Sequence, residues 1–169
     1  MWVDRATPEF IRRVAEQMRD SDVRELLALS WLDGPESLTA ALVERYGPVG
    51  LAVGNGAGPI AVGAVIEHRP HVLTLGLFAT SAFVTIARPL ARFVKRGLLA
   101  PAITGGAHRI EAVSWAEHRA AHRWIEALGL RQEAVYRKFG KNGEDFIQFA
   151  WVKKDVCASC FGDGSARRH

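Results

Sequence analysis

The segment 108–152 constrains the fold most, because four secondary-structure patterns follow one another in it without interruption. A short apolar run predicts a strand, and the helical spacing that follows it stops at Gly129. Two further β-type runs flank a polar turn signal at 141–143. Because each run has its own period, the segment predicts the order strand, helix, strand, tight turn and strand.

The N-terminal third is predicted to be mostly helical after a short first strand. Thr7 can cap the first helix, and Pro8 can occupy its first position, where the missing N–H costs nothing. Asp20 or Ser21 can cap a second helix, and apolar residues at helical spacing predict a third helix over 37–46. Two or three helices are therefore expected before the next strand.

The middle of the chain changes to β-type patterns. Asn55 and Gly56 separate two of these runs and give a strong hairpin signal, and Gly76 inside the next run predicts a bulge or a close backbone approach. A helix is predicted over 85–99, followed by a loop over 100–107. Mixed strands with a few crossover helices predict an α/β fold, a single three-layer domain whose mixed central sheet has about six to seven strands with flanking helices.

The length of 169 residues fits one domain, expected over 1–156 with a flexible C-terminal tail over 157–169. With 49% hydrophobic and 24% charged residues, the composition is typical of a globular protein. No apolar stretch approaches the roughly 20 residues that span a bilayer, and the N-terminus has no signal-peptide pattern, so a cytoplasmic protein is expected. The net charge of +4 selects no particular partner.

Cys157 and Cys160 form a single Cys-x-x-Cys near the C-terminus. A tetrahedral zinc site needs four ligands, and the sequence has no second cysteine pair. Inert reduced thiols are therefore predicted, while a disulfide and a metal ion shared across a dimer remain alternatives.

The helix of the C-terminal segment carries a pattern of its own. His118 is followed by Ala121 three residues later, then by the bulky pair Trp124 and Ile125, and by the ending Leu-Gly-Leu at 128–130. With its flanking strands, this pattern resembles the GCN5-related N-acetyltransferase (GNAT) family, in which an Asn stands at the place of His118. It is most similar to the degenerate GNAT-like proteins of T7-type tailed phages. The resemblance covers about a quarter of the chain.

The resemblance implies that acetyl-CoA binds as a co-substrate in a V between two splayed parallel strands, 72–79 and 108–115. The backbone of the first strand would pair with the pantetheine. Amides at the following helix start would hold the pyrophosphate, because unpaired N–H groups favour anions. The residues expected at the cofactor are Leu77, Phe78, Ala79, Thr85, Ile86, Ala87, Arg88, Ala121 and Trp124.

Three departures from the family pattern bear on catalysis. The stretch 80–90 has no glycine, where the family has a glycine-rich phosphate loop. Ile125 occupies the place of the tyrosine that serves the family as general acid, and the strand 71–80 lacks the glutamate that serves as base. Because positioning alone lowers a barrier by several kcal/mol, these losses weaken the case for catalysis without closing it.

Four candidate catalytic residues remain. His118 is predicted to point into the cleft, where it can act as general base. The alternative is a partly buried histidine bonded to a backbone carbonyl. Ser114 can relay a proton at the end of its strand, Glu67 with His68 can order a water molecule, and Tyr136 can replace the missing phenol. Polar residues at strand ends are also common without any function.

Two further patterns on the helices suggest a binding site but can also be explained as polar helix surfaces. His118, His122 and Glu126 recur at steps of four, a spacing at which two histidines can share a metal ion. A third strong ligand is not evident, so a polar helix edge is expected and no metal site. Basic residues on the helix over 85–99 can hold phosphates or an acidic partner, or form a solvated face. They are Arg88, Arg92, Lys95 and Arg96.

Two functions follow from these observations. The first is an acetyl-CoA-dependent N-acetyltransferase that acts on an amine of a small molecule or of a protein, such as a host protein. The alternative is a catalytically inactive GNAT-fold phage protein that acts as a virion component or binds and modulates a host protein. Nucleic acid is not an expected partner, because no aromatic residues interleave with the basic stripe. A homodimer is a further possibility that the sequence does not decide.

Overall fold

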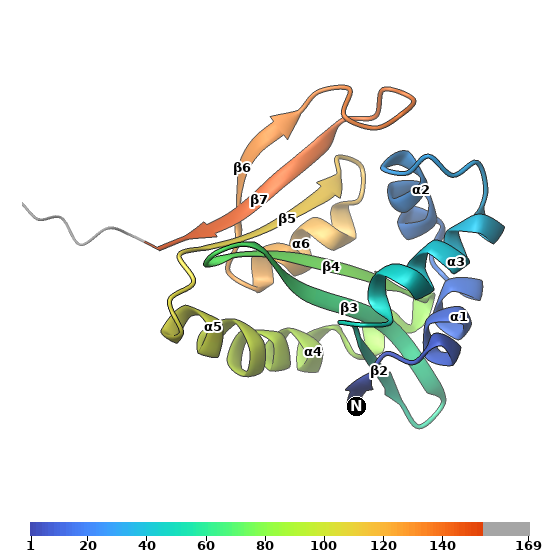
Figure 1. Ribbon diagram of the computed structural model, residues 1–169, viewed down its shortest axis with the longest axis horizontal. Coiled ribbons are helices and arrows are strands. Elements are labelled where there is room, and N and C mark those ends of the chain that lie inside the picture. Colours follow the sequence, from blue (N-terminus) through green and yellow to red (C-terminus); the bar gives the residue numbers. More distant parts are fainter. Residues whose placement is uncertain (154–169) are drawn as a thin grey trace, which may run out of the picture.

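The computed structural model describes residues 1–153, which form a seven-stranded mixed sheet with helices on both faces (Figure 1). The strands lie in the order β1-β2-β3-β4-β5-β7-β6, and among the described strands only β4 and β5 pair in parallel. Cys157, Cys160 and the predicted tail lie outside the described residues. The strands are β1 (Trp2–Arg5), β2 (Leu51–Asn55), β3 (Gly58–Arg69), β4 (Val72–Ala79), β5 (Arg109–Trp115), β6 (Arg131–Tyr136) and β7 (Phe146–Val152).

Two helical layers cover the sheet and bury two apolar cores. The N-terminal helices pack over Val62 and Phe78, and the later helices pack on the other face over Ile110 and Phe149. The predicted three-layer α/β architecture is therefore confirmed. None of the described helices is long and apolar enough to span a membrane. The helical segments are α1 (Pro8–Glu16), α2 (Asp20–Ala28), α3 (Pro35–Tyr46), η1 (Ser81–Thr85), α4 (Ala87–Phe93), η2 (Val94–Leu99), α5 (Ala100–Thr104) and α6 (Arg119–Ala127).

Two local predictions are confirmed in the N-terminal half. The Thr7 side chain accepts a hydrogen bond from the Phe10 N–H at 3.2 Å, and Pro8 begins α1. The hairpin signal at 55–56 lies at the turn between β2 and β3. Both features depend only on residues that are close in sequence, so they are visible without the fold.

The start of α2 differs from the prediction. Asp20 and Ser21 lie within the first turn of the helix, and neither caps it. Arg19 occupies the N-cap position, and its N–H donates to the Ala79 carbonyl at 3.0 Å. A tertiary hydrogen bond to the end of β4 therefore decides where α2 begins, and it overrides the local capping signals.

The loop predicted over 100–107 is wrong for its first half, because the chain stays helical until Thr104. One π-helical turn, η2, lies between α4 and α5 and precedes Pro101. A proline ring clashes with the turn before it in a regular α-helix, and a wider turn relieves that clash. Gly106, with φ +109, then ends the helical segment.

The connection between β6 and β7 is longer than the predicted tight turn, because β6 already ends at Tyr136. The turn signal at 141–143 lies inside it, where the Gly143 N–H donates to the Gly140 carbonyl and Gly143 adopts φ +88. The Lys141 N–H donates to the Ala28 carbonyl at 2.9 Å. The connection is therefore tied to the end of α2 and is more than a simple hairpin turn.

β4 and β5 pair only near their N-terminal ends, where residues 72–74 lie opposite 109–111. Beyond Thr74 the two strands diverge, since each follows its own antiparallel neighbour, β3 or β7. The edge of β4 from Leu75 onward therefore faces a V-shaped opening in the sheet and has no strand partner there (Figure 1).

Gly76 lies where the Tyr46 side chain crosses β4. A Cβ atom at Gly76 would be 2.6 Å from the Tyr46 hydroxyl oxygen, well inside van der Waals contact. The Tyr46 ring packs edge-on against Phe78, with ring centroids 5.2 Å apart. The bulge predicted as one possibility at Gly76 is absent, because the β3–β4 register is regular there, and the close approach to this glycine is made by a side chain rather than by another backbone segment.

Gly76→Ala is expected to destabilise the protein by about 1–3 kcal/mol, since the new methyl group overlaps the Tyr46 hydroxyl. Adding Tyr46→Phe should recover most of this loss, because it removes the overlapping oxygen. Urea denaturation gives the free energies of unfolding. Gly56→Ala is the control, since nothing lies within 4 Å of a Cβ atom there. Equal losses at Gly56 and Gly76 would contradict the close approach.

Candidate functional site

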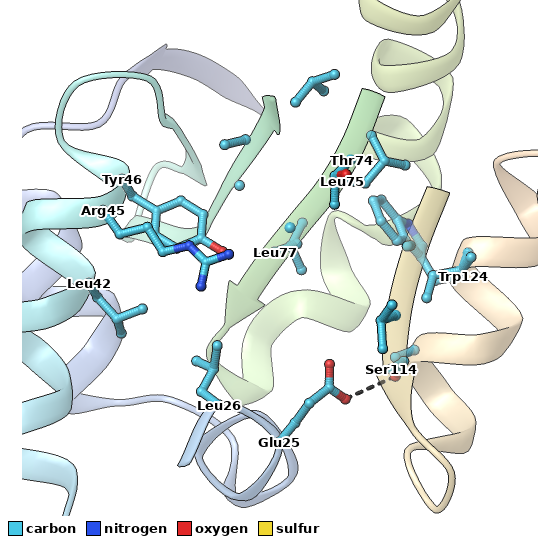
Figure 2. A pocket seen from close by; sticks show the side chains of 18 of the residues that line it. Glu25, Leu26, Leu42, Arg45, Tyr46, Thr74, Leu75, Leu77, Ser114 and Trp124 are labelled. Atoms are coloured by element: carbon cyan, nitrogen blue, oxygen red, sulfur yellow. Dashed lines mark hydrogen bonds between the residues drawn. The ribbon is translucent and has the colours of Figure 1, made fainter. Parts of the chain in front are cut away.

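A pocket of about 600 Å³ passes through the V between β4 and β5 (Figure 2). Leu77 and Ser114 lie on its two strand walls. On one side of the sheet it continues beside Tyr46 of α3, and on the other side beside Trp124 of α6. Most of the lining is apolar, and a cluster of polar side chains lies where β5 meets α2.

The helix α2 closes the open end of the V through two carboxylates that lie one turn apart. Asp22 Oδ2 accepts a hydrogen bond from the Ala79 N–H of β4 at 2.8 Å. Glu25 Oε2 accepts hydrogen bonds from the Ser114 hydroxyl at 2.9 Å and from the Trp115 N–H at 3.0 Å, both at the end of β5. The helix therefore joins the diverging ends of the two strands.

Asp22 is only 3% exposed, and Arg19 compensates its charge with Nη2 at 2.7 Å from Oδ2. Burial raises the pKa of Asp22 above its ordinary value, while Arg19, the Ala79 N–H and His118 oppose that shift. The Arg19 guanidinium also lies 4.9 Å from the centre of the Phe83 ring. These neighbours stabilise a carboxylate that has little access to water.

His118, which is 6% exposed, lies between the two carboxylates. Its Nδ1 is 2.9 Å from Glu25 Oε2, and because a carboxylate only accepts, Nδ1 carries the proton. Its Nε2 is buried 3.4 Å from Asp22 Oδ1, a distance that permits charge attraction, but it makes no hydrogen bond within residues 1–153. Nδ1 is engaged with Glu25 and Nε2 is buried, so the general-base role of His118 stays a prediction.

Of the residues predicted at the cofactor, Leu77, Ala121 and Trp124 line the pocket. Phe78 is fully buried in the core on the α3 side of the sheet. Both backbone groups of Ala79 are occupied by the α2 segment, its N–H and its C=O alike. The part of the β4 edge that is open to a ligand therefore lies before Ala79.

The predicted pyrophosphate region at the start of α4 is largely packed. Ile86 is buried, and the Thr85 hydroxyl donates to a carbonyl of its own turn at 2.8 Å. The Ala87 carbonyl accepts a hydrogen bond from Trp124 Nε1 at 3.0 Å. Arg88 is exposed, so among these residues it is the side chain placed to meet an anion.

Glu67 and Tyr136 lie away from the polar cluster. Glu67 accepts a hydrogen bond from a backbone N–H at 2.6 Å in the turn between β3 and β4, at the closed end of the V. Tyr136 ends β6 and packs against Phe139 with ring centroids 5.0 Å apart. The structure therefore brings Ser114 and His118 together, but not Glu67 or Tyr136.

Asp22, Glu25 and Tyr46 are site residues that the sequence analysis missed. A signal for the two acids exists, because with Leu26 and Leu29 they follow the i, i+3, i+4, i+7 spacing of one helix face. Carboxylates on an otherwise apolar face indicate either a solvated helix edge or buried polar partners, and only the fold distinguishes these two cases.

No family model and no curated protein matches the chain by sequence. Its structure is similar to those of acetyltransferases. A protein assigned as an acetyltransferase aligns over 89% of this chain and 84% of its own, at 21% identity and a TM-score of 0.70. A GNAT-family acetyltransferase from Bacillus anthracis aligns over 89% and 93%, at 17% identity and 0.64. The yncA protein from Salmonella typhimurium, solved with its cofactor acetyl-CoA, aligns over 93% and 96%, at 14% identity and 0.64.

These similarities establish the fold. The mixed seven-stranded sheet with its flanking helices is that of GNAT acetyltransferases, and it spans most of the length of each protein compared. At such low sequence identities a shared fold does not establish a shared reaction, so a reaction has to be argued from the residues of the pocket.

Asp22→Ala is expected to lower the free energy of unfolding by about 2–4 kcal/mol, because it leaves Arg19 and the buried Ala79 N–H without their partner. Asp22→Asn should cost less, since its amide oxygen can still accept from Ala79. Asp33→Ala, at an exposed loop position, is the control and should change stability by no more than about 0.5 kcal/mol. Equal losses of stability for Asp22→Ala and Asp33→Ala in urea denaturation would contradict the role of Asp22 in joining α2 to β4.

His122 lies on the side of α6 that faces β7. Its Nε2 donates to the Trp115 carbonyl at 2.9 Å, and its ring lies 5.2 Å from the Phe149 ring. Burial lowers the pKa of His122 below its ordinary value, against the effect of the Trp115 carbonyl, and the positive charge of Arg119 lowers it further. No group of three or more metal-ligating side chains comes together in the part of the chain that the structure describes.

Because the pKa of His122 is lower in the folded state, its contribution to stability is complete above about pH 6.5 and is lost as the pH falls through the folded pKa. The free energy of unfolding should therefore fall more steeply on acidification from about pH 7 in the wild type than in His122→Gln. Urea denaturation at a series of pH values measures this difference. His68→Gln, at an exposed histidine, should keep the wild-type dependence of the free energy of unfolding on pH. Parallel pH profiles for the wild type and His122→Gln would contradict a lowered pKa for His122.

Proposed function

We propose that the protein is an acetyl-CoA-dependent N-acetyltransferase that moves an acetyl group to an amine of a small molecule or a protein in the cytoplasm. The pocket through the V carries this proposal. It combines an unpaired strand edge, apolar walls and a polar cluster at one end. A thioester and an amine that react with each other need such a place, where both are positioned and water is excluded.

The residues fit the acyl end of acetyl-CoA better than its phosphates. The backbone groups of Leu75 and Leu77 point to the same edge of β4 as those of Ala79, and unlike Ala79 they have no strand or helix opposite them. They are placed to pair with the amides of a pantetheine. At the phosphate end, Arg88 supplies charge, while the glycine-free stretch 80–90 restricts access to the amides.

A thioester bound there would supply an activated acetyl carbon. The amine nitrogen bonds to this carbon while the carbon–sulfur bond breaks, the bonding pair leaves on sulfur, and a proton of the amine finally reaches the thiolate. The chain contributes positioning, exclusion of water and a polar cluster of Glu25, Ser114 and His118 at the pocket wall, in which Glu25 Oε1 is an acceptor without a partner among the described residues.

A second function, in a GNAT-fold protein that does not transfer acetyl groups, is favoured by other features of the structure. The α2 segment occupies both backbone groups of Ala79, so the chain itself fills part of the strand edge expected to bind the pantetheine. Trp31 is 100% exposed and Leu29 is 47% exposed, as is typical of a surface that contacts another protein. Such a protein would serve as a phage virion component or as a modulator of a host protein.

Isothermal titration with acetyl-CoA separates the two functions. Ala121→Phe should weaken binding at least about tenfold, because the ring fills the pocket. Ala120→Phe is the matched control, since it makes the same change at the exposed neighbouring position of α6. Release of free thiol on addition of an amine then reports the transfer. No heat of binding to the wild type at high protein concentration would overturn the acetyltransferase and leave the second function.

A further inference from the structure

We infer that Glu25 binds the ammonium group of the acceptor, and that the acceptor is a monoamine carried on an apolar body. This inference rests on the proposed acetyl transfer, but amine binding at Glu25 can be measured independently of that transfer. The juxtaposition that carries the inference is a carboxylate oxygen without a partner at the wall of an apolar pocket.

Glu25 is held in place by only one of its two carboxylate oxygens. Oε2 accepts hydrogen bonds from the Ser114 hydroxyl at 2.9 Å, the Trp115 N–H at 3.0 Å and His118 Nδ1 at 2.9 Å. Oε1 accepts none from the described residues, and Figure 2 shows it turned away from Ser114 into the pocket, toward Leu77. Because the donors on Oε2 fix the carboxylate, Oε1 is presented to a ligand in one direction.

The charges around Glu25 favour a cation at Oε1. Arg19 is already engaged with Asp22 at 2.7 Å. His118 donates from Nδ1 to Oε2 of Glu25 and directs Nε2 at Asp22, so it makes no hydrogen bond to Oε1. An ammonium group brings both a positive charge and N–H donors, and such charge-assisted hydrogen bonds are roughly twice as strong as neutral ones. A neutral alcohol of the same shape supplies only the weaker bond.

The part of the pocket beside α2 and α3 is suited to the apolar body of the acceptor. Leu26, Leu42 and the Tyr46 ring form its walls, and Leu29 adds apolar surface at the rim. Arg45 is exposed at the same rim, 5.9 Å from the Tyr46 ring, and Figure 2 shows its guanidinium directed into the pocket. This positive charge disfavours a second ammonium group on the ligand. An alkyl or aryl monoamine therefore fits, and a polyamine does not.

Isothermal titration with hexylamine and 2-phenylethylamine tests the inference, with and without CoA present. Hexan-1-ol has the same chain as hexylamine without the charge, and spermidine carries additional charges, so both should bind at least about tenfold more weakly. Glu25→Gln removes the charge at nearly constant size and should weaken hexylamine binding at least about tenfold. Glu44→Gln makes the same change at an exposed position of α3 and should bind like the wild type.

Equal affinities of the wild type for hexylamine and hexan-1-ol would overturn the inference, and this comparison does not depend on the folding of any variant. Equal affinities of Glu25→Gln and Glu44→Gln would overturn it as well. Binding of acetyl-CoA without binding of either amine would overturn the inference and leave the acetyltransferase standing. Amine binding that requires the Glu25 charge, in a protein that does not bind acetyl-CoA, would support the inference and overturn the proposed function.

Discussion

Two carboxylates on one turn of α2 hold the V in its shape. Past Thr74 no ladder joins β4 to β5, so the backbone groups at the far ends of the two facing edges need other partners. Asp22 accepts the Ala79 N–H, and Glu25 accepts the Trp115 N–H. Both are charge-assisted hydrogen bonds in a site with little water, where such bonds are strong and their loss is costly. The helix thus replaces, at the open end of the V, the ladder that joins the strands elsewhere.

The same bridge connects the helical layers on the two faces of the sheet. Arg19, the partner of Asp22, lies over the Phe83 ring, which packs edge-on against Trp124 with centroids 5.5 Å apart. Trp124 in turn donates to the Ala87 carbonyl at the start of α4. Continuous contacts therefore run from α2, past the end of β4, to α6 and α4. Because interiors this densely packed deform little, a pocket framed by such contacts can stay open without a ligand.

The periodicity of apolar residues was sufficient to predict the α/β architecture, because each helix or strand depends mainly on its own neighbours in sequence. The errors fall where a distant contact or an unusual turn intervenes. The hydrogen bond from Arg19 to Ala79 sets the start of α2, and the wide turn before Pro101 keeps the chain helical. The site was less predictable for the same reason: Glu25 and Ser114 are 89 residues apart, so neither local sequence indicates the other.

His118 and the two acids of α2 are best understood as one unit. In the GNAT pattern an Asn stands at this place, whereas His118 directs its two ring nitrogens at two carboxylates. Without Glu25 the buried Nδ1–H of this imidazole would lose its acceptor, at a cost in stability. The histidine at 118 therefore depends on the two acids of α2 for its partners. It also returns titratable groups to a pocket from which the family's tyrosine and strand glutamate are missing, so their absence alone does not exclude proton transfer at this site.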